Sequence, residues 1–97
     1  MTADPRPDTL ALVLAVCAVC LDRAPGTLGP QDGFLALGGT SIQAFMANTA
    51  LEERLAGRLP PDGIPITAII QEPTLAAFAA RIDRVLETAS GDKEGVL

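Results

Sequence analysis

The residue best placed to do chemistry is Ser41, which follows a glycine-rich segment and begins a predicted helix. The local sequence reads Leu37-Gly38-Gly39-Thr40-Ser41-Ile42. The first N–H groups of a helix lack internal partners and the helix dipole is positive there, so a phosphate carried by the Ser41 hydroxyl would be stabilised. Gly38 and Gly39 add no side-chain bulk and permit a positive φ, so another protein could approach the hydroxyl closely. The alternative is that Ser41 or Thr40 only caps the helix.

Two catalytic interpretations of this serine are excluded by the residues around it. A serine-hydrolase elbow reads G-x-S-x-G, but Gln43 occupies the last position and the chain has no histidine to act as a base. A P-loop needs a lysine beside the serine, and the single lysine of the sequence is Lys93. Without histidine, the Ser-His-Asp triad, the Cys-His dyad and the commonest metal ligand are all excluded. An enzyme is therefore the function class that we favour least.

The second chemically suggestive motif is the C-x-x-C pair formed by Cys17 and Cys20. Redox pairs gain reactivity at a helix N-terminus, where the dipole lowers the thiol pKa, but this pair lies late in an apolar helix. A zinc site would need two further ligands, and only carboxylates remain to supply them. We therefore expect no metal site and interpret both cysteines as small apolar side chains within a helix.

Length and charge limit the remaining possibilities. A chain of 97 residues forms one domain. The formal net charge of -5 argues against nucleic acid as a partner, because binding of phosphates needs basic residues. The twelve apolar residues from Leu10 to Leu21 are too few to span a membrane, and the acidic residues before them do not fit an export signal. We expect a cytoplasmic protein that does not associate with a membrane.

The composition indicates the fold class. Hydrophobic residues make up 48% of the chain but aromatic residues only 3%, and aliphatic residues without aromatic partners suit helices better than strands. We predict an all-α fold, a small four-helix bundle with helices at 8–22, 41–56, 66–72 and 75–88. A long connector rich in glycine and proline joins the first two helices. The core of the domain spans about residues 8–88, and 89–97 are expected to form a flexible tail.

The predicted helices also assign side chains to the core and to solvent. We expect the connector to be anchored by Phe34, Leu35 and Leu37. In the second helix, one face is expected to contain Ile42, Phe45, Met46 and Thr49. Leu51 and Leu55 are expected to continue the core-facing side of this helix. Thr74 is expected to cap the last helix. The residues of this helix expected to face the core are Leu75, Phe78, Ala79, Ile82, Val85 and Leu86, and those expected to face water are Arg81, Asp83, Arg84 and Glu87. The first helix is expected to begin with a cap at Asp8 or Thr9.

Two segments together resemble a known family. The string DGFLALGGTSIQAF at 32–45 is followed by IPITAIIQEPTLAAFAARI at 64–82. They are similar to the carrier (thiolation) domains of nonribosomal peptide synthetases and, more distantly, to acyl carrier proteins. Those domains are four-helix bundles whose second helix begins at a serine in an L-G-G-x-S-[LI] motif and whose short third helix precedes a Pro-Thr pair. Leu37–Ile42 matches the first motif, and Pro73-Thr74 matches the second.

The resemblance implies that Ser41 Oγ receives 4′-phosphopantetheine from coenzyme A through a separate phosphopantetheinyl transferase. The thiol of this arm would hold an aminoacyl or peptidyl group as a thioester. An adenylation enzyme would load that group, condensation or other tailoring enzymes would act on it, and the chain itself would catalyse nothing. The start Met-Thr-Ala-Asp is typical of a native N-terminus, so we expect a free-standing carrier in nonribosomal peptide or related secondary-metabolite biosynthesis.

Two alternatives stay open beside this interpretation. One is an acyl carrier protein for polyketide or fatty-acid chains, although the double glycine favours the peptidyl type and aspartate usually precedes the serine in acyl carriers. The other is a helical interaction module that is never loaded, in which Ser41 is only a cap. It would bind a partner stably through an apolar face.

The resemblance further indicates a docking surface for partner enzymes, made of Thr40, Ile42, Gln43 and Met46. We expect Phe45 in the core, whereas Met46 suits either core or surface. Three features depart from the family pattern. Thr40 stands where Asp or His is common, the loop at 57–65 is longer than usual, and the first helix is so apolar that it could bind a partner or a second copy.

Overall fold

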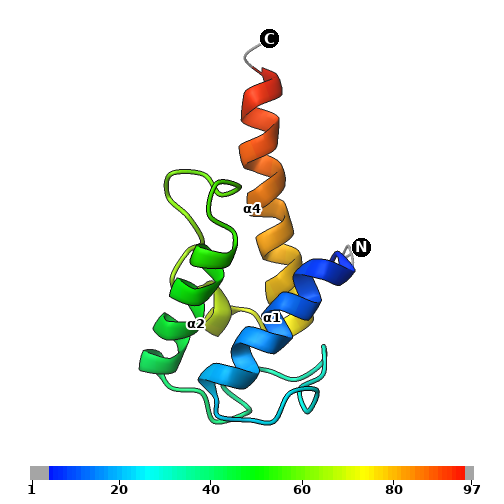
Figure 1. The fold of residues 1–97 in the computed structure, drawn as a ribbon, viewed down its shortest axis with the longest axis vertical. Coiled ribbons are helices and arrows are strands. Elements are labelled where there is room, and N and C mark those ends of the chain that lie inside the picture. The colour runs from blue at the N-terminus through cyan, green and yellow to red at the C-terminus, as the bar shows by residue number, and fades with distance from the viewer. Residues whose placement is uncertain (1–4, 96–97) are drawn as a thin grey trace.

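A computed structural model describes the backbone of residues 5–95 and the side chains of residues 5–88. Within this range the chain is all-helical, with α1 at Pro7–Cys20, α2 at Ser41–Arg54, α3 at Ala68–Gln71 and α4 at Leu75–Gly95. α1 packs against both α2 and α4, and the short α3 joins α2 to α4 (Figure 1). The predicted all-α four-helix bundle is therefore confirmed.

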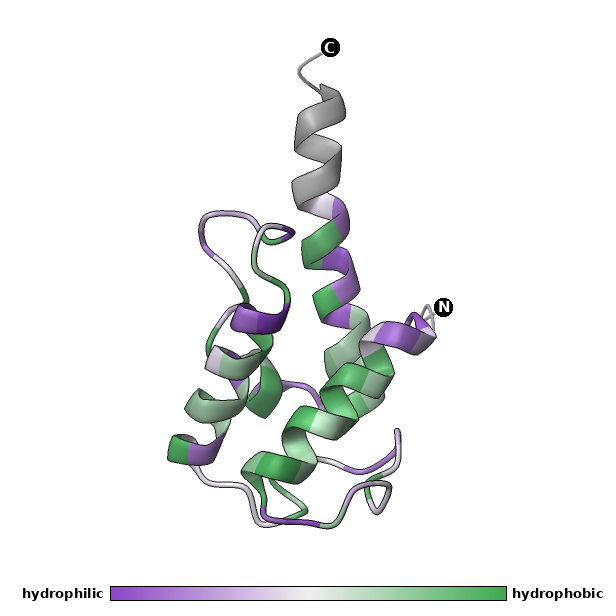
Figure 2. Cartoon of the chain, in the orientation of Figure 1, coloured by the Kyte–Doolittle hydropathy of each residue, from purple (hydrophilic) through white to green (hydrophobic). Residues whose placement is uncertain are grey.

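The core is aliphatic apart from two phenylalanine rings. The largest fully buried side chains are Phe34, Phe78, Leu51, Ile69, Leu75, Ile82, Val13 and Cys17. They come from all four helices and from the connector between α1 and α2. Along the part of α4 whose hydropathy is drawn in Figure 2, apolar and polar residues alternate by face, whereas α1 is apolar over most of its length. No helix in the described part of the chain is long and apolar enough to cross a membrane.

The start of α1 differs from the prediction. The N-cap is Arg6, without a side-chain hydrogen bond, and Pro7 occupies the first turn, where its missing N–H costs nothing. Thr9 is buried, and its hydroxyl donates to Asp83 Oδ1 at 2.6 Å while the Arg6 N–H donates to Asp83 Oδ2 at 2.7 Å. Neither Asp8 nor Thr9 is therefore the cap. The prediction that Asp83 faces water is also wrong, because α1 covers it.

This buried network should contribute strongly to stability. Asp83→Ala is expected to lower the free energy of unfolding by about 2–3 kcal/mol, because the buried Thr9 hydroxyl and the part-buried Arg6 N–H lose their acceptor. Urea unfolding followed by far-UV circular dichroism measures the loss. The matched control is Glu87→Ala, an exposed acid on the same helix, which should change stability by no more than about 0.5 kcal/mol. Equal effects of the two substitutions would contradict a stabilising role for Asp83.

The connector is pinned to the core and to the start of α4. Phe34 is buried as predicted, Leu37 is half-buried, and Leu35 is exposed, so the prediction that Leu35 anchors the connector is wrong. The Leu75 N–H donates to the carbonyl of Asp32 at 2.8 Å, and the Ala76 N–H donates to that of Pro30 at 2.9 Å. The first N–H groups of α4 thus find their acceptors in the connector, which holds the two segments together.

α2 buries Leu51 and Leu55 as predicted, but the predicted face of Ile42, Phe45, Met46 and Thr49 does not face the core. Its buried residues are Ala44, Ala47, Asn48 and Leu51. Three large apolar side chains face water instead, with exposed fractions of 74% for Ile42, 56% for Phe45 and 50% for Met46, and Thr49 is also exposed. The small side chains of Ala44 and Ala47 are fully buried along the face that packs on the core. The expected core position of Phe45 is thus corrected to a surface position.

The second half of the chain follows the predicted order of elements. The loop after α2 bends at Gly57, whose φ is +89°, and returns to α2 where the Ile64 N–H donates to Glu52 Oε2 at 3.0 Å. α4 begins as predicted, since the Ala77 N–H donates to Thr74 Oγ1 at 3.1 Å. Five of the six residues predicted to face the core are buried, and the sixth, Val85, is half-buried. The backbone of α4 remains helical to Gly95, which includes most of the segment 89–97 that was expected to form a flexible tail.

Candidate functional site

The segment before Ser41 is a hydrogen-bonded turn that fixes where α2 begins. The N–H groups of Leu37, Gly38 and Gly39 donate to the carbonyls of Gly33, Leu35 and Phe34, each at 3.0 Å. Gly38 has a φ of +88°, which residues with a Cβ rarely adopt. The sequence-based expectation of a positive φ in this turn is therefore confirmed at Gly38.

Gly39 is required for a different reason, which is space. A Cβ on Gly39 would overlap the ring of Phe34, whereas a Cβ on Gly38 would meet no atom within 4 Å. The two glycines thus have separate roles. Gly38 allows the backbone to turn, and Gly39 allows the start of α2 to lie directly against the buried Phe34 ring.

The cap of α2 is Thr40 and not Ser41. The Thr40 hydroxyl accepts from the Gln43 N–H at 3.2 Å, and Gln43 Oε1 accepts from the Thr40 N–H at 2.9 Å. These two contacts form a capping box, which satisfies two N–H groups at the helix start. Of the two caps considered from the sequence, Thr40 is therefore confirmed and Ser41 is wrong. Gln43, which the family resemblance places on the docking surface, is half-buried, and its side chain accepts a hydrogen bond in the cap.

Ser41 occupies the first position of α2, and its side chain is exposed. The hydrogen bonds found among residues 5–88 leave the N–H groups of Ser41 and Ile42 without a protein acceptor. The hydroxyl therefore stands beside two outward-facing donors at the positive end of a 14-residue helix. This arrangement suits a serine that carries an anionic group.

The surface around Ser41 is apolar. Ile42, Phe45 and Met46 are exposed along α2, and Leu35 is exposed in the preceding turn. Of the four predicted docking residues, Thr40, Ile42 and Met46 are exposed. The exposure of Phe45 was missed because an apolar side chain at helical spacing is usually assigned to the core, and that of Leu35 because it was expected to anchor the connector.

The cysteine pair lies near the end of α1. Cys17 is fully buried and Cys20 is half-buried, and both are free thiols. Burial, with a smaller contribution from the neighbouring Cys20, raises the pKa of the Cys17 thiol to about 12, and burial also raises the pKa of Cys20. Among the described side chains no group of three or more His, Cys, Asp or Glu could hold a metal ion. The cysteines thus behave as apolar core residues.

This burial predicts an order of thiol reactivity. At pH 8.5 with iodoacetamide, Cys20 should be alkylated well before Cys17, because the attacking species is the thiolate and Cys17 stays protonated and enclosed. Peptide mapping over time measures the two rates. In urea the two rates should converge, since the unfolded chain exposes both thiols. Faster alkylation of Cys17 than of Cys20 in the folded protein would contradict this assignment.

The sequence matches the family described as "Phosphopantetheine attachment site" over residues 11–82, which include the Ser41 turn, α2, α3 and the start of α4. The chain belongs to this phosphopantetheine attachment-site family. The resemblance to carrier domains drawn from the two motifs is thereby confirmed at the level of the family. Members of this family carry covalently attached 4′-phosphopantetheine, which is therefore the cofactor of this carrier domain.

Two curated relatives of the carrier domain are reductases. The L-2-aminoadipate reductase of Saccharomyces cerevisiae is 36% identical over 75 residues, and the L-2-aminoadipate reductase large subunit of Candida glabrata is 33% identical over 75 residues. Each alignment covers 77% of this chain but 5% of the relative. The chain thus corresponds to a small part of these proteins. No solved structure matches the sequence.

The residues of the carrier domain fit the cofactor in two respects. The arm attaches through a phosphate, and the start of α2 offers an exposed hydroxyl together with two outward N–H groups. In addition, Gly38 leaves open space beside its backbone, so no side chain there obstructs an enzyme that reaches for the hydroxyl. Carrier domains of this family are not catalytic themselves and work with a phosphopantetheinyl transferase and with adenylation or other catalytic domains.

Proposed function

We propose that Ser41 Oγ is the attachment site of 4′-phosphopantetheine and that the chain, with residues 8–88 as its working unit, is a non-catalytic carrier. The observation that carries this proposal is the capping box at Thr40. The capping box satisfies N–H groups at the start of α2 without using Ser41, so the Ser41 hydroxyl stays exposed. On loading, the hydroxyl loses its proton as a phosphodiester forms, and the nucleotide half of coenzyme A leaves.

The start of α2 then stabilises the product of loading. The phosphodiester carries one negative charge, and the N–H groups of Ser41 and Ile42 can donate to its oxygens. The helix dipole adds a favourable contribution of about 0.3–1 kcal/mol at an exposed site. When bound, the arm supplies a terminal thiol that can hold an acyl group as a thioester. The chain's own task is to hold the attachment point rigidly on α2.

We propose an aminoacyl or peptidyl cargo, in nonribosomal peptide or related secondary-metabolite biosynthesis. Two observations support it. The curated relatives are named for an amino acid, L-2-aminoadipate, and the double glycine before Thr40 favours the peptidyl type. The alternative is an acyl carrier for polyketide or fatty-acid chains. Thr40 does not decide between the two, because it departs from the residue that usually precedes the serine in both types.

Partner enzymes are proposed to dock on the exposed apolar side chains beside Ser41. Thr40, Ile42 and Met46 form this docking surface, and Phe45 extends it. Exposed apolar patches of this kind typically mark sites of protein association. The net charge of -5 suits transient encounters with basic enzyme surfaces. We place the carrier in the cytoplasm, where its two free thiols would stay reduced.

The test is intact-mass measurement after the chain is incubated with coenzyme A, magnesium and a promiscuous phosphopantetheinyl transferase. The wild-type chain should gain one phosphopantetheine. Aminoacylation of the loaded chain by adenylation enzymes, measured against acylation by acyl-transferring enzymes, then separates the peptidyl from the acyl carrier. A folded chain that gains no mass with two different transferases would overturn the carrier proposal in favour of a helical interaction module.

A further inference from the structure

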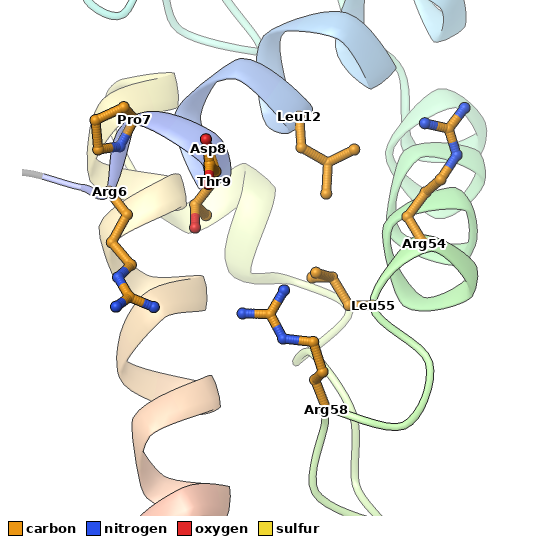
Figure 3. Close-up of a pocket in the computed structure, with 8 residues that line it drawn as sticks. All are labelled: Arg6, Pro7, Asp8, Thr9, Leu12, Arg54, Leu55 and Arg58. Atoms are coloured by element: carbon orange, nitrogen blue, oxygen red, sulfur yellow. The ribbon is translucent and has the colours of Figure 1, made fainter.

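The end of α2 opposite to Ser41 borders a pocket of about 570 Å³. It lies between the first turn of α1, the last turn of α2 and the loop that follows α2 (Figure 3). The residues that matter for its chemistry are Arg6, Asp8, Leu12, Arg54, Leu55 and Arg58.

The pocket concentrates positive charge on an acidic protein. Arg6, Arg54 and Arg58 are three of the chain's six arginines, and Asp8 is the one acidic residue of the lining. The lining therefore carries +3 and -1, or +2 in total, on a chain of net charge -5, and the buried Asp83 carboxylate lies behind Arg6 and Thr9 of the lining. The ion pair found among residues 5–88, Arg81 with Glu72, lies outside the pocket. A positive pocket on a negative surface attracts anions locally.

Two guanidinium groups face each other across this pocket. In Figure 3 the side chains of Arg6 and Arg58 point toward one another, while Arg54 points along α2 away from them. Two facing cations repel, and an anion between them would remove the repulsion while accepting hydrogen bonds from both. Leu12 and Leu55 add an apolar wall beside this position. One side of the pocket is therefore cationic, at Arg6 and Arg58, and another is apolar, at Leu12 and Leu55.

The backbone on both sides of the pocket is held in place. The Arg6 N–H donates to Asp83 Oδ2 at 2.7 Å, which ties this side to α4. The Arg58 N–H donates to the Leu55 carbonyl at 3.0 Å, which closes the turn after α2. These two hydrogen bonds hold the backbone at Arg6 and Arg58, while both side chains remain exposed to a ligand.

We propose that this pocket binds a small amphipathic anion, with a carboxylate or phosphate head held by Arg6 and Arg58 and a short apolar chain against Leu12 and Leu55. The site does not depend on the loading of Ser41. Ser41 and Arg54 are the first and last residues of the 14-residue α2, which separates them by about 20 Å along the helix axis. Failure of this proposal and failure of the carrier proposal are therefore distinguishable.

The test is an NMR titration of the ¹⁵N-labelled 97-residue chain with n-butyl phosphate, butyrate and inorganic phosphate at constant ionic strength. We expect saturable shifts of amide signals at 6–12 and 54–58 with butyl phosphate, with butyrate or with both, which identifies the preferred head group. The better of these two should bind more tightly than inorganic phosphate, because the alkyl chain covers the apolar wall. Shifts that grow linearly without saturation, or equal affinity for inorganic phosphate, would overturn the proposal.

Variants separate a built site from a general effect of net charge. The double variant Arg6→Gln/Arg58→Gln should weaken binding at least about tenfold, since it removes both bidentate donors. Asp8→Asn should strengthen binding, because it removes the one negative charge of the lining. The matched control Arg23→Gln/Arg84→Gln removes the same charge at exposed positions outside the pocket and should leave binding within about twofold. Equal weakening by the two double variants would overturn the proposal.

Discussion

A Ser41→Ala variant is expected to remain completely unloaded under conditions in which the wild-type chain gains one phosphopantetheine. The variant removes the one oxygen to which the phosphate would attach. Because Ser41 is exposed and the capping of α2 is done by Thr40 and Gln43, the substitution should change the free energy of unfolding by no more than about 0.5 kcal/mol. Intact-mass spectrometry measures loading, and urea unfolding measures stability.

The chain supplies a matched control for this variant. Its sequence contains two serines, Ser41 and Ser90, so Ser90→Ala removes a serine of the same type outside the family match. Ser90→Ala should load fully. Loading of Ser41→Ala at the wild-type rate would contradict the assignment of the site.

The largest expected loss of stability follows from Phe34→Ala. Phe34 is a fully buried aromatic residue of the connector, and its ring fills the space that the glycine at position 39 leaves open. Removing a buried ring costs about 3–5 kcal/mol, through lost burial and through the cavity that remains. Since small domains are stabilised by only about 5–15 kcal/mol, this substitution should remove a large share of the total.

Phe45→Ala is the matched control for Phe34→Ala, because it removes the same ring from an exposed position on α2. Its cost should be no more than about 1 kcal/mol. The sequence contains no Trp or Tyr, so urea unfolding is best followed by the helical signal in far-UV circular dichroism. If the two substitutions destabilised the protein equally, the connector would not be anchored by Phe34 as the structure indicates.

Much of the fold could be predicted because its signals are local. Glycine and proline clusters mark the ends of helices, Thr74 is a strong N-cap, and α4 has a clear three- and four-residue repeat of apolar residues. The start of α2 at Ser41 also follows from the glycines just before it. In each case the deciding residues lie within a few positions of the feature that they determine.

The failed predictions depend on contacts between distant segments. Asp83 looks like a solvent residue until Thr9, 74 positions away in the sequence, donates a hydrogen bond to it. The face of α2 was assigned wrongly because both of its faces are apolar, and the larger residues give the stronger signal. The buried face instead uses Ala44 and Ala47, whose small side chains suit close packing. Which apolar face is buried depends on the partner helix, and the local pattern does not contain that information.

The same limit applies to the functional surface. The identity of the serine could be proposed from the sequence, because two motifs occur in the right order. The exposure of Phe45 could not, since an apolar residue at helical spacing is more often buried than displayed. The division of labour between Thr40 and Ser41 likewise required the hydrogen-bond geometry of the capping box.

The most direct test of the attachment site is fragmentation of the loaded wild-type chain by tandem mass spectrometry with a soft method that retains the arm. This measurement uses no substitution, so folding defects cannot confuse it. The arm should be found on every fragment that contains Ser41 and on no fragment that contains Thr40 without Ser41. An arm located on Thr40, on Ser90 or on any other residue would contradict the assignment of Ser41 as the loaded serine.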